Sequence, residues 1–187
     1  MQNEIKDTSF QAYFERWLEK FRKDLWKQRQ QIFDDFLFVW KELCDKVADS
    51  CQLVEYIEIS VLRSSLCEKG EVWFILEAFD ENWLFGSPIV AMDSHMPILT
   101  KIFQLHRECV LREARRYIGK IPAKMVMKGI LGIMPKIDQT LAMILGENAE
   151  SLLSCIKSEK TSYSESIRLS LGEYRRFHYK ILFMRCD

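Results

Sequence analysis

The sequence predicts an α+β fold that is mostly helical, with a small antiparallel β-meander packed by several helices. Three observations support this prediction. Aromatic and aliphatic residues recur at helical spacing near the N-terminus, and a run rich in β-branched residues follows them. After that run the helical spacing returns. The chain has 187 residues, of which 48% are hydrophobic, and we expect residues 1–187 to form a single domain.

A long amphipathic helix is predicted over residues 8–48, and Thr8 and Gln11 form a capping box at its start. A straight helix of this length would measure about 60 Å, whereas a compact domain of this size is roughly 40 Å across. We therefore expect the helix either to break near residues 27–31 or to project as an aromatic arm that binds a partner. The apolar stripe of this helix consists of Phe10, Phe14, Trp17, Phe21, Leu25, Ile32, Phe36, Trp40, Leu43 and Val47.

A β-meander is predicted over residues 53–86. Two runs rich in β-branched and aromatic residues, 53–63 and 71–80, indicate antiparallel strands, and residues 83–86 indicate a short third strand. Trp73 and Trp83 would then lie on neighbouring strands, where they could form an aromatic surface for a base or a peptide. Packing of these rings in the core is the favoured alternative.

Several helices are expected over residues 94–156. Asp93 or Ser94 could cap the first of them, with Pro97 in its first turn. An apolar stretch further along contains Pro135, which favours two short helices that meet near this proline over one continuous helix.

Residues 162–184 carry two different signals. Ser162 and Glu165 form a capping box, which favours a short helix that ends at Gly172. Residues 176–184 alternate between apolar and polar side chains, which favours a strand. We expect this strand to join the meander.

Charge is segregated along a chain whose net charge is zero. Residues 101–136 contain nine Lys and Arg against two acids, and residues 49–93 contain nine acids against two basic residues. The favoured interpretation is that the two segments neutralise each other inside the fold; the alternative is an external anionic partner. The candidate residues for binding that partner are Arg112, Arg115, Arg116, Lys120, Lys124 and Lys128.

Motifs for catalysis, cofactors or metals are not evident. The sequence contains no GxSxG, HExxH or GxGxxG pattern. His106, Cys109 and Glu113 have helical spacing that could bring metal ligands together, but no second half of a metal site accompanies them. A hydrogen-bonded core histidine is the favoured interpretation of His106, so we expect no metal and no cofactor.

These observations favour a non-catalytic protein-interaction or regulatory module that binds a partner, or a second copy, through its N-terminal helix. One alternative is a binder of nucleic acid or another anionic ligand through residues 101–136; another is an enzyme whose site is assembled from distant residues. We expect no membrane span, because no run approaches ~18 apolar residues. The N-terminus has no secretory signal pattern and the six cysteines form no framework, so a cytoplasmic location is expected.

Overall fold

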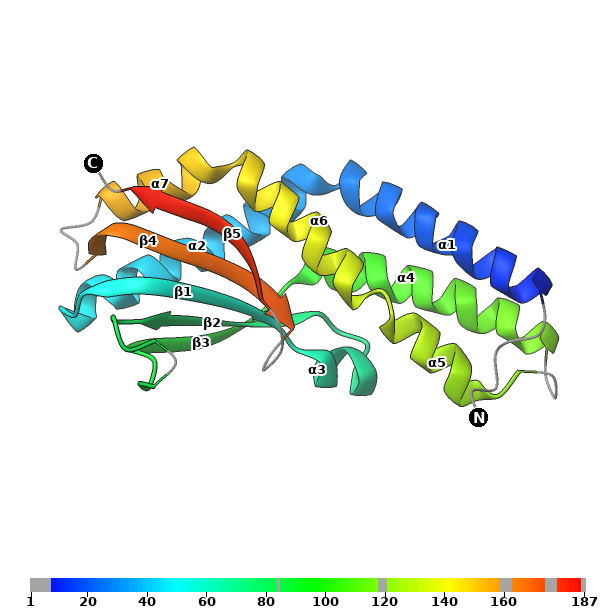
Figure 1. Ribbon diagram of the computed structural model, residues 1–187. Coiled ribbons are helices and arrows are strands. Elements are labelled where there is room, and N and C mark those ends of the chain that lie inside the picture. The colour runs from blue at the N-terminus through cyan, green and yellow to red at the C-terminus, as the bar shows by residue number, and fades with distance from the viewer. Residues whose placement is uncertain (1–7, 84, 118–120, 159–162, 174–177, 186–187) are drawn as a thin grey trace.

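The computed structural model describes residues 8–83, 85–117, 121–158, 163–173 and 178–185. Within these ranges the α+β prediction is confirmed, because helices flank a single mixed sheet (Figure 1). The elements are α1 (Thr8–Lys27), α2 (Arg29–Ser50), β1 (Val54–Val61), α3 (Arg63–Glu68), β2 (Trp73–Phe79), β3 (Val90–His95), α4 (Pro97–Ala114), a 3-10 turn (Arg115–Tyr117), α5 (Ala123–Leu131), α6 (Met134–Glu147), α7 (Ala149–Ser158), β4 (Tyr163–Glu173) and β5 (His178–Arg185).

The N-terminal helix breaks at Gln28, inside the predicted interval. The backbone N–H of Gln28 still bonds to the carbonyls of Asp24 and Leu25, at 3.3 and 3.1 Å, and its own carbonyl accepts the first bond of α2 from Ile32. Because the break lets α1 and α2 follow different parts of the core, the apolar stripe does not project into solvent. Every residue of the stripe is buried except Phe14, which is half-buried and packs against the core.

The described strands form a sheet in the order β3-β2-β1-β4-β5. The pairs β1–β2, β2–β3 and β4–β5 are antiparallel, whereas β1 and β4 are parallel. The prediction of strands at 53–63 and 71–80 is therefore confirmed by β1 and β2. The prediction of a third strand at 83–86 is wrong, because Trp83 and Phe85 lie in a turn and the third strand is β3.

The C-terminal part departs most from the prediction. The expected helix at 162–172 is wrong, because residues 163–173 form β4, whereas the strand expected at 176–184 is confirmed by β5. Ile167, Leu169 and Leu171 alternate along β4 and are at most 1% exposed. This two-residue period fits a strand paired on both sides, so hydrogen bonding to β1 and β5 overrides the local capping box.

Helix α4 begins at Pro97, three residues later than the predicted boundary, because Asp93 and Ser94 belong to β3. Its N-terminus is capped from another helix, since the carboxylate of Asp35 on α2 accepts the backbone N–H of Ile98 at 3.3 Å. The expected break near Pro135 is confirmed: α5 ends at Leu131, and α6 begins at Met134 with the proline in its first turn.

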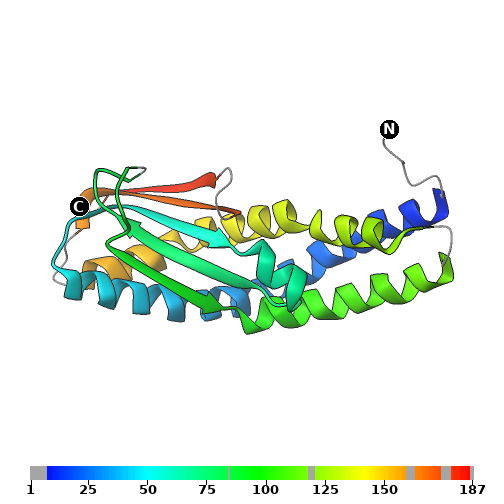
Figure 2. The ribbon, with the colours of Figure 1, turned by 90° about the horizontal axis from the view of Figure 1, so that it is seen from below.

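Helices and sheet together give an elongated arrangement. Helices α2, α6 and α7 lie on one side of the sheet, and none of the described helices lies across the opposite side (Figures 1 and 2). Helices α1, α4 and α5 extend beyond the sheet, so the end of the molecule at α5 lies far from the start of β1 (Figure 1). Within the described residues, no helix is long and apolar enough to cross a membrane.

Candidate binding strip on helix α4

The predicted anion-binding residues lie at the helical end of the molecule. Arg112 is on α4, Arg115 and Arg116 are in the 3-10 turn after it, and Lys124 and Lys128 are on α5. Arg112, Arg115, Arg116, Lys124 and Lys128 are all exposed, and Lys120 lies outside the described residues. Figures 1 and 2 show that this end is the one farthest from the turn between β2 and β3.

The expected neutralisation of the basic segment by the acidic segment is wrong for the described residues. No ion pair between described residues joins 101–136 to 49–93, and the basic residue paired within the segment is Arg116, to Glu113 at 3.0 Å. Two acidic residues of the meander accept hydrogen bonds locally: Glu58 from the Trp83 indole at 2.8 Å and Glu71 from the Trp73 indole at 2.9 Å. The hydrogen-bond donors to these two carboxylates are thus neutral indoles and not the Lys and Arg side chains that the sequence suggested.

A hollow of about 400 Å³ lies where α1 meets α4. Its aromatic lining from α1 is fixed to the backbone of α4: the Tyr13 hydroxyl donates to the Cys109 carbonyl at 3.2 Å, and the Trp17 indole donates to the His106 carbonyl at 3.0 Å. Burial raises the pKa of Tyr13 above its ordinary value, so this hydroxyl keeps the proton it donates. The hollow is lined by Tyr13, Arg16, Trp17, Lys20, Asp24, Leu105, His106 and Cys109.

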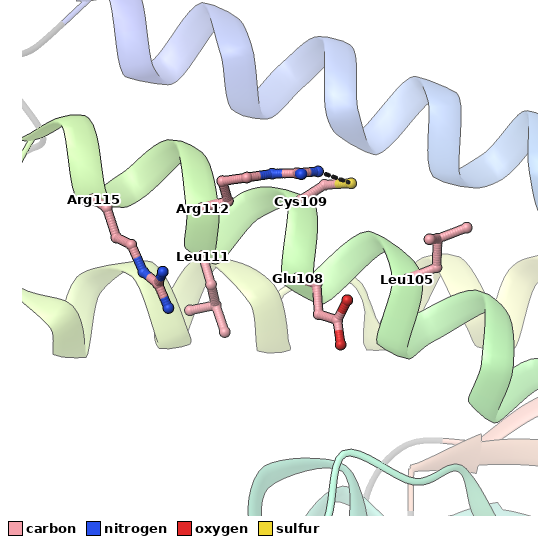
Figure 3. Close-up of a pocket in the computed structure, with 6 residues that line it drawn as sticks. All are labelled: Leu105, Glu108, Cys109, Leu111, Arg112 and Arg115. Atoms are coloured by element: carbon pink, nitrogen blue, oxygen red, sulfur yellow. Dashed lines mark hydrogen bonds between the residues drawn. The ribbon is translucent and has the colours of Figure 1, made fainter.

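A second hollow, of about 360 Å³, adjoins the first on α4. Figure 3 shows Arg115, Leu111 and Glu108 pointing to one side of the helix, while Arg112 reaches back to Cys109. The Arg112 guanidinium donates to the Cys109 thiol at 3.6 Å. The two hollows share Leu105 and Cys109, and the Leu105 side chain is 61% exposed between them. We call the two hollows together the α4 strip.

Leu105 is exposed because it falls outside the buried stripe of its helix. That stripe contains Leu99, Phe103, His106 and Val110, which are all buried at three- and four-residue steps. Leu105 was not among the sequence-based candidates, and neither were Arg16 and Lys20 on α1. Projection of α4 as a helix could have found Leu105, since it is an apolar residue on a polar face. The pairing of α1 with α4 could not be found in that way.

At the base of the α1–α4 hollow, Asp24 contacts His106. The His106 ring is 3% exposed and packs edge-on against Phe21, with ring centroids 5.2 Å apart. Its Nε2 lies 3.0 Å from the Asp24 carboxylate. Burial lowers the pKa of His106 below its ordinary 6.5, and the hydrogen bond and charge of Asp24 oppose that shift. The neutral ring must therefore carry its proton on Nε2, because a carboxylate only accepts.

Among the described residues, His106 and Asp24 form no hydrogen bond to a thiol or a hydroxyl group. The Cys109 thiol accepts from Arg112, and His95 is hydrogen-bonded to Thr100, so neither contact joins a thiol to an imidazole. Among the residues that the structure describes, no three His, Cys, Asp or Glu side chains lie close enough to hold a metal ion. His106 therefore orders the packing of α1 on α4, as a hydrogen-bonded core histidine does.

The two candidate tryptophans do not share one aromatic surface. Trp83 stacks on Tyr56, with ring centroids 5.0 Å apart and an angle of 5°, and Tyr56 pairs with Phe79 at one end of β2. Trp73 lies at the other end of β2, about 20 Å away at the usual rise per strand residue. It lies beside His95. The structure thus places them in two separate half-buried clusters.

Comparison with known proteins gives no further guide to the site: no protein-family model matches the chain, and neither a curated protein nor a solved structure shows significant similarity. A functional assignment therefore depends on the geometry of the α4 strip itself.

Proposed function

We propose that the protein is a non-catalytic interaction module that binds an acidic segment of a partner protein through the α4 strip. The observation that supports this most directly is the position of Leu105, 61% exposed between two hollows. An exposed apolar side chain in a hollow, with cations at its rim, has the composition of an interface centre and its polar border.

Four cations line the α4 strip: Arg16 and Lys20 from α1, and Arg112 and Arg115 at α4 and the turn that follows it. None of them forms an ion pair with a carboxylate in the described part of the chain. Their charges are therefore available to an anionic partner. Because they flank the strip on both sides, they favour a partner with carboxylates around an apolar centre.

A protein partner is favoured over a nucleic acid for two reasons. Glu108 also lines the α4 strip, and its carboxylate would repel a phosphate backbone that followed it. The chain has no net positive charge, whereas nucleic-acid-binding domains usually have a basic excess. An acidic peptide can place its carboxylates only at the cations, which a continuous polyanion cannot do.

The apolar stripe of α1 and α2 is not available to this partner. All of its residues except the half-buried Phe14 are buried within the fold, so a contact through the stripe would require α1 to leave α4. The N-terminal helix would instead contribute its outer side, through Arg16 and Lys20. The proposed interface thus combines the first helix with the basic segment.

The experiment is a fluorescence-anisotropy titration with three probes of similar charge: a peptide with one Phe flanked by glutamates, a peptide of glutamates alone, and a single-stranded oligothymidylate. We expect the Phe-containing peptide to bind most tightly. The double variant Arg112→Glu, Arg115→Glu should weaken its binding by at least about tenfold.

The matched control is Lys41→Glu, Lys46→Glu, which changes the net charge equally on exposed positions of α2. It should bind the Phe-containing peptide as the unmodified protein does. Equal losses in both double variants would show a general charge effect and reject the α4 strip as the site. Tightest binding of the oligothymidylate would reject the acidic-protein proposal in favour of nucleic acid.

A further inference from the structure

A second exposed apolar side chain lies at the opposite end of the molecule from α5. Phe85 is 96% exposed, in the turn between β2 and β3. The backbone there is held by its own hydrogen bonds: Asn82 N–H to the Asp80 carboxylate at 2.8 Å, and Phe85 N–H to the Asn82 carbonyl at 2.7 Å. We call Asp80, Glu81, Asn82, Trp83 and Phe85 the Phe85 turn.

Trp83 attaches this turn to the sheet. Its ring stacks on Tyr56 of β1, and its indole N–H donates to the Glu58 carboxylate at 2.8 Å. These contacts hold Asn82 and Trp83 in place, which lowers the entropy cost of ordering this part of the turn in a complex. A backbone that is already held by such contacts loses less conformational freedom when it enters a partner, which favours a role in binding.

The Phe85 turn and the α1–α4 hollow have complementary chemistry. The turn carries an exposed aromatic ring beside two carboxylates, Asp80 and Glu81. The hollow has an aromatic and aliphatic lining beside two cations, Arg16 and Lys20. Its volume of about 400 Å³ is ample for a phenyl ring, since a closed cavity of about 150 Å³ can hold benzene.

The negative charge of Asp24 in the hollow does not prevent this match. Its carboxylate is turned toward His106 at 3.0 Å and has the Lys27 ammonium at 3.9 Å. It is therefore partly neutralised before any ligand arrives.

We propose that the Phe85 turn of one copy of this chain docks into the α1–α4 hollow of a second copy. This inference rests on the proposed function and names the acidic partner as the protein itself. Figures 1 and 2 show the turn between β2 and β3 at the end of the molecule opposite α5, away from the middle of α1 and α4. One copy cannot fill its own hollow with a turn fixed at that distance.

The resulting contact is heterologous, because a turn on one copy meets a different surface on the next. Such an interface leaves a free turn and a free hollow at the two ends of every dimer, so it continues into open chains unless the rotation closes a ring. The net charge of zero favours this association, since two copies do not repel each other as a whole.

The first test is sedimentation velocity on the full chain over a concentration series. We expect the mean mass to rise with concentration at low salt and to fall when salt screens the charges. Phe85→Ser should weaken association by about 30-fold or more, as for a central interface residue. The matched control is Phe38→Ser, which removes another Phe that is 73% exposed, on α2, and it should associate like the unmodified chain.

The second test mixes two variants. The Phe85→Ser chain keeps its hollow, and the Arg16→Glu, Lys20→Glu chain keeps its turn. Each alone should be monomeric, and the mixture should form dimers of one copy each that grow no further, because only one complementary pair of surfaces remains. Absence of such dimers, or undiminished association of Phe85→Ser, would overturn the inference.

The two proposals fail in different ways. If the unmodified chain stays monomeric at low salt but still binds the Phe-containing acidic peptide, self-association is rejected and the interaction module remains. If neither is observed, both proposals are rejected. Association that the Phe38→Ser control also loses would reject the Phe85 turn as the contact.

Discussion

The stripe of α1 and α2 and the pair Leu105 and Phe85 contain side chains of the same kind, but they have opposite environments. The stripe is buried in the core except for the half-buried Phe14, whereas Leu105 is 61% and Phe85 is 96% exposed. Large apolar side chains in the core stabilise the fold by leaving water. Leu105 and Phe85 remain largely in water in the single chain, so they contribute little of this stabilisation. We propose a role in binding for these two side chains, and the contrast with the stripe can be tested by changing one member of each set.

The largest effect is expected from Trp40→Ala. The Trp40 ring is 0% exposed, and its indole donates to the Leu152 carbonyl at 3.1 Å, which ties α2 to α7. Its removal leaves a cavity and takes away this hydrogen bond, so the free energy of unfolding should fall by about 3–5 kcal/mol. Urea denaturation measures this change. A loss below about 1 kcal/mol would contradict the assignment of the stripe to the core.

An intermediate, pH-dependent effect is expected at His106, which is buried against Phe21 and also lines the α1–α4 hollow. Its pKa is lower in the folded chain than the ordinary 6.5, so the unfolded chain binds more protons as the pH falls. This stability contribution is complete above about pH 6.5 and is lost as the pH falls toward the folded pKa.

The variant His106→Gln should therefore be less stable at neutral pH and should show a flatter decline of stability between pH 7 and pH 5. Urea denaturation at a series of pH values gives both quantities. An unchanged slope would show that other groups cause the decline and that the contact between Asp24 and His106 has no part in it.

The smallest effect on stability is expected from Leu105→Ser. A substitution at an exposed helix position usually changes the free energy of unfolding by less than about 0.5 kcal/mol. Binding of the Phe-containing peptide should nevertheless weaken by about tenfold. Loss of stability comparable to that of Trp40→Ala would show that Leu105 belongs to the core, and the distinction between the two sets would fail.

The parts of the fold that could be predicted from the sequence are those with strong local periodicity. The stripe of Phe10 to Val47 predicted the N-terminal helix, and its length relative to a compact domain predicted the break that occurs at Gln28. Residue type and alternation predicted β1, β2 and β5. β4 was missed because Ser162 and Glu165 suggested a helix start, whereas pairing with β1 depends on residues about a hundred positions away.

The candidate site was predicted in part. Arg112 and Arg115 were proposed from charge alone, and they line the α4 strip. Arg16 and Lys20 were not proposed, because only the packing of α1 on α4 brings them to the same hollow. The neutralisation of the basic by the acidic segment was expected from equal and opposite charge counts, and counts carry no information about distance.

The sequence by itself determined where most helices and strands lie and which of their sides is apolar. Both depend on the spacing of apolar residues along the chain. Only the tertiary structure decided which neighbours those sides meet. It set Leu105 between two hollows, turned Asp24 toward His106, and placed Phe85 and the basic helices at different ends of the molecule. The physical reason is that long-range contacts are selected by the packing and hydrogen bonding of the whole core, which no single segment specifies.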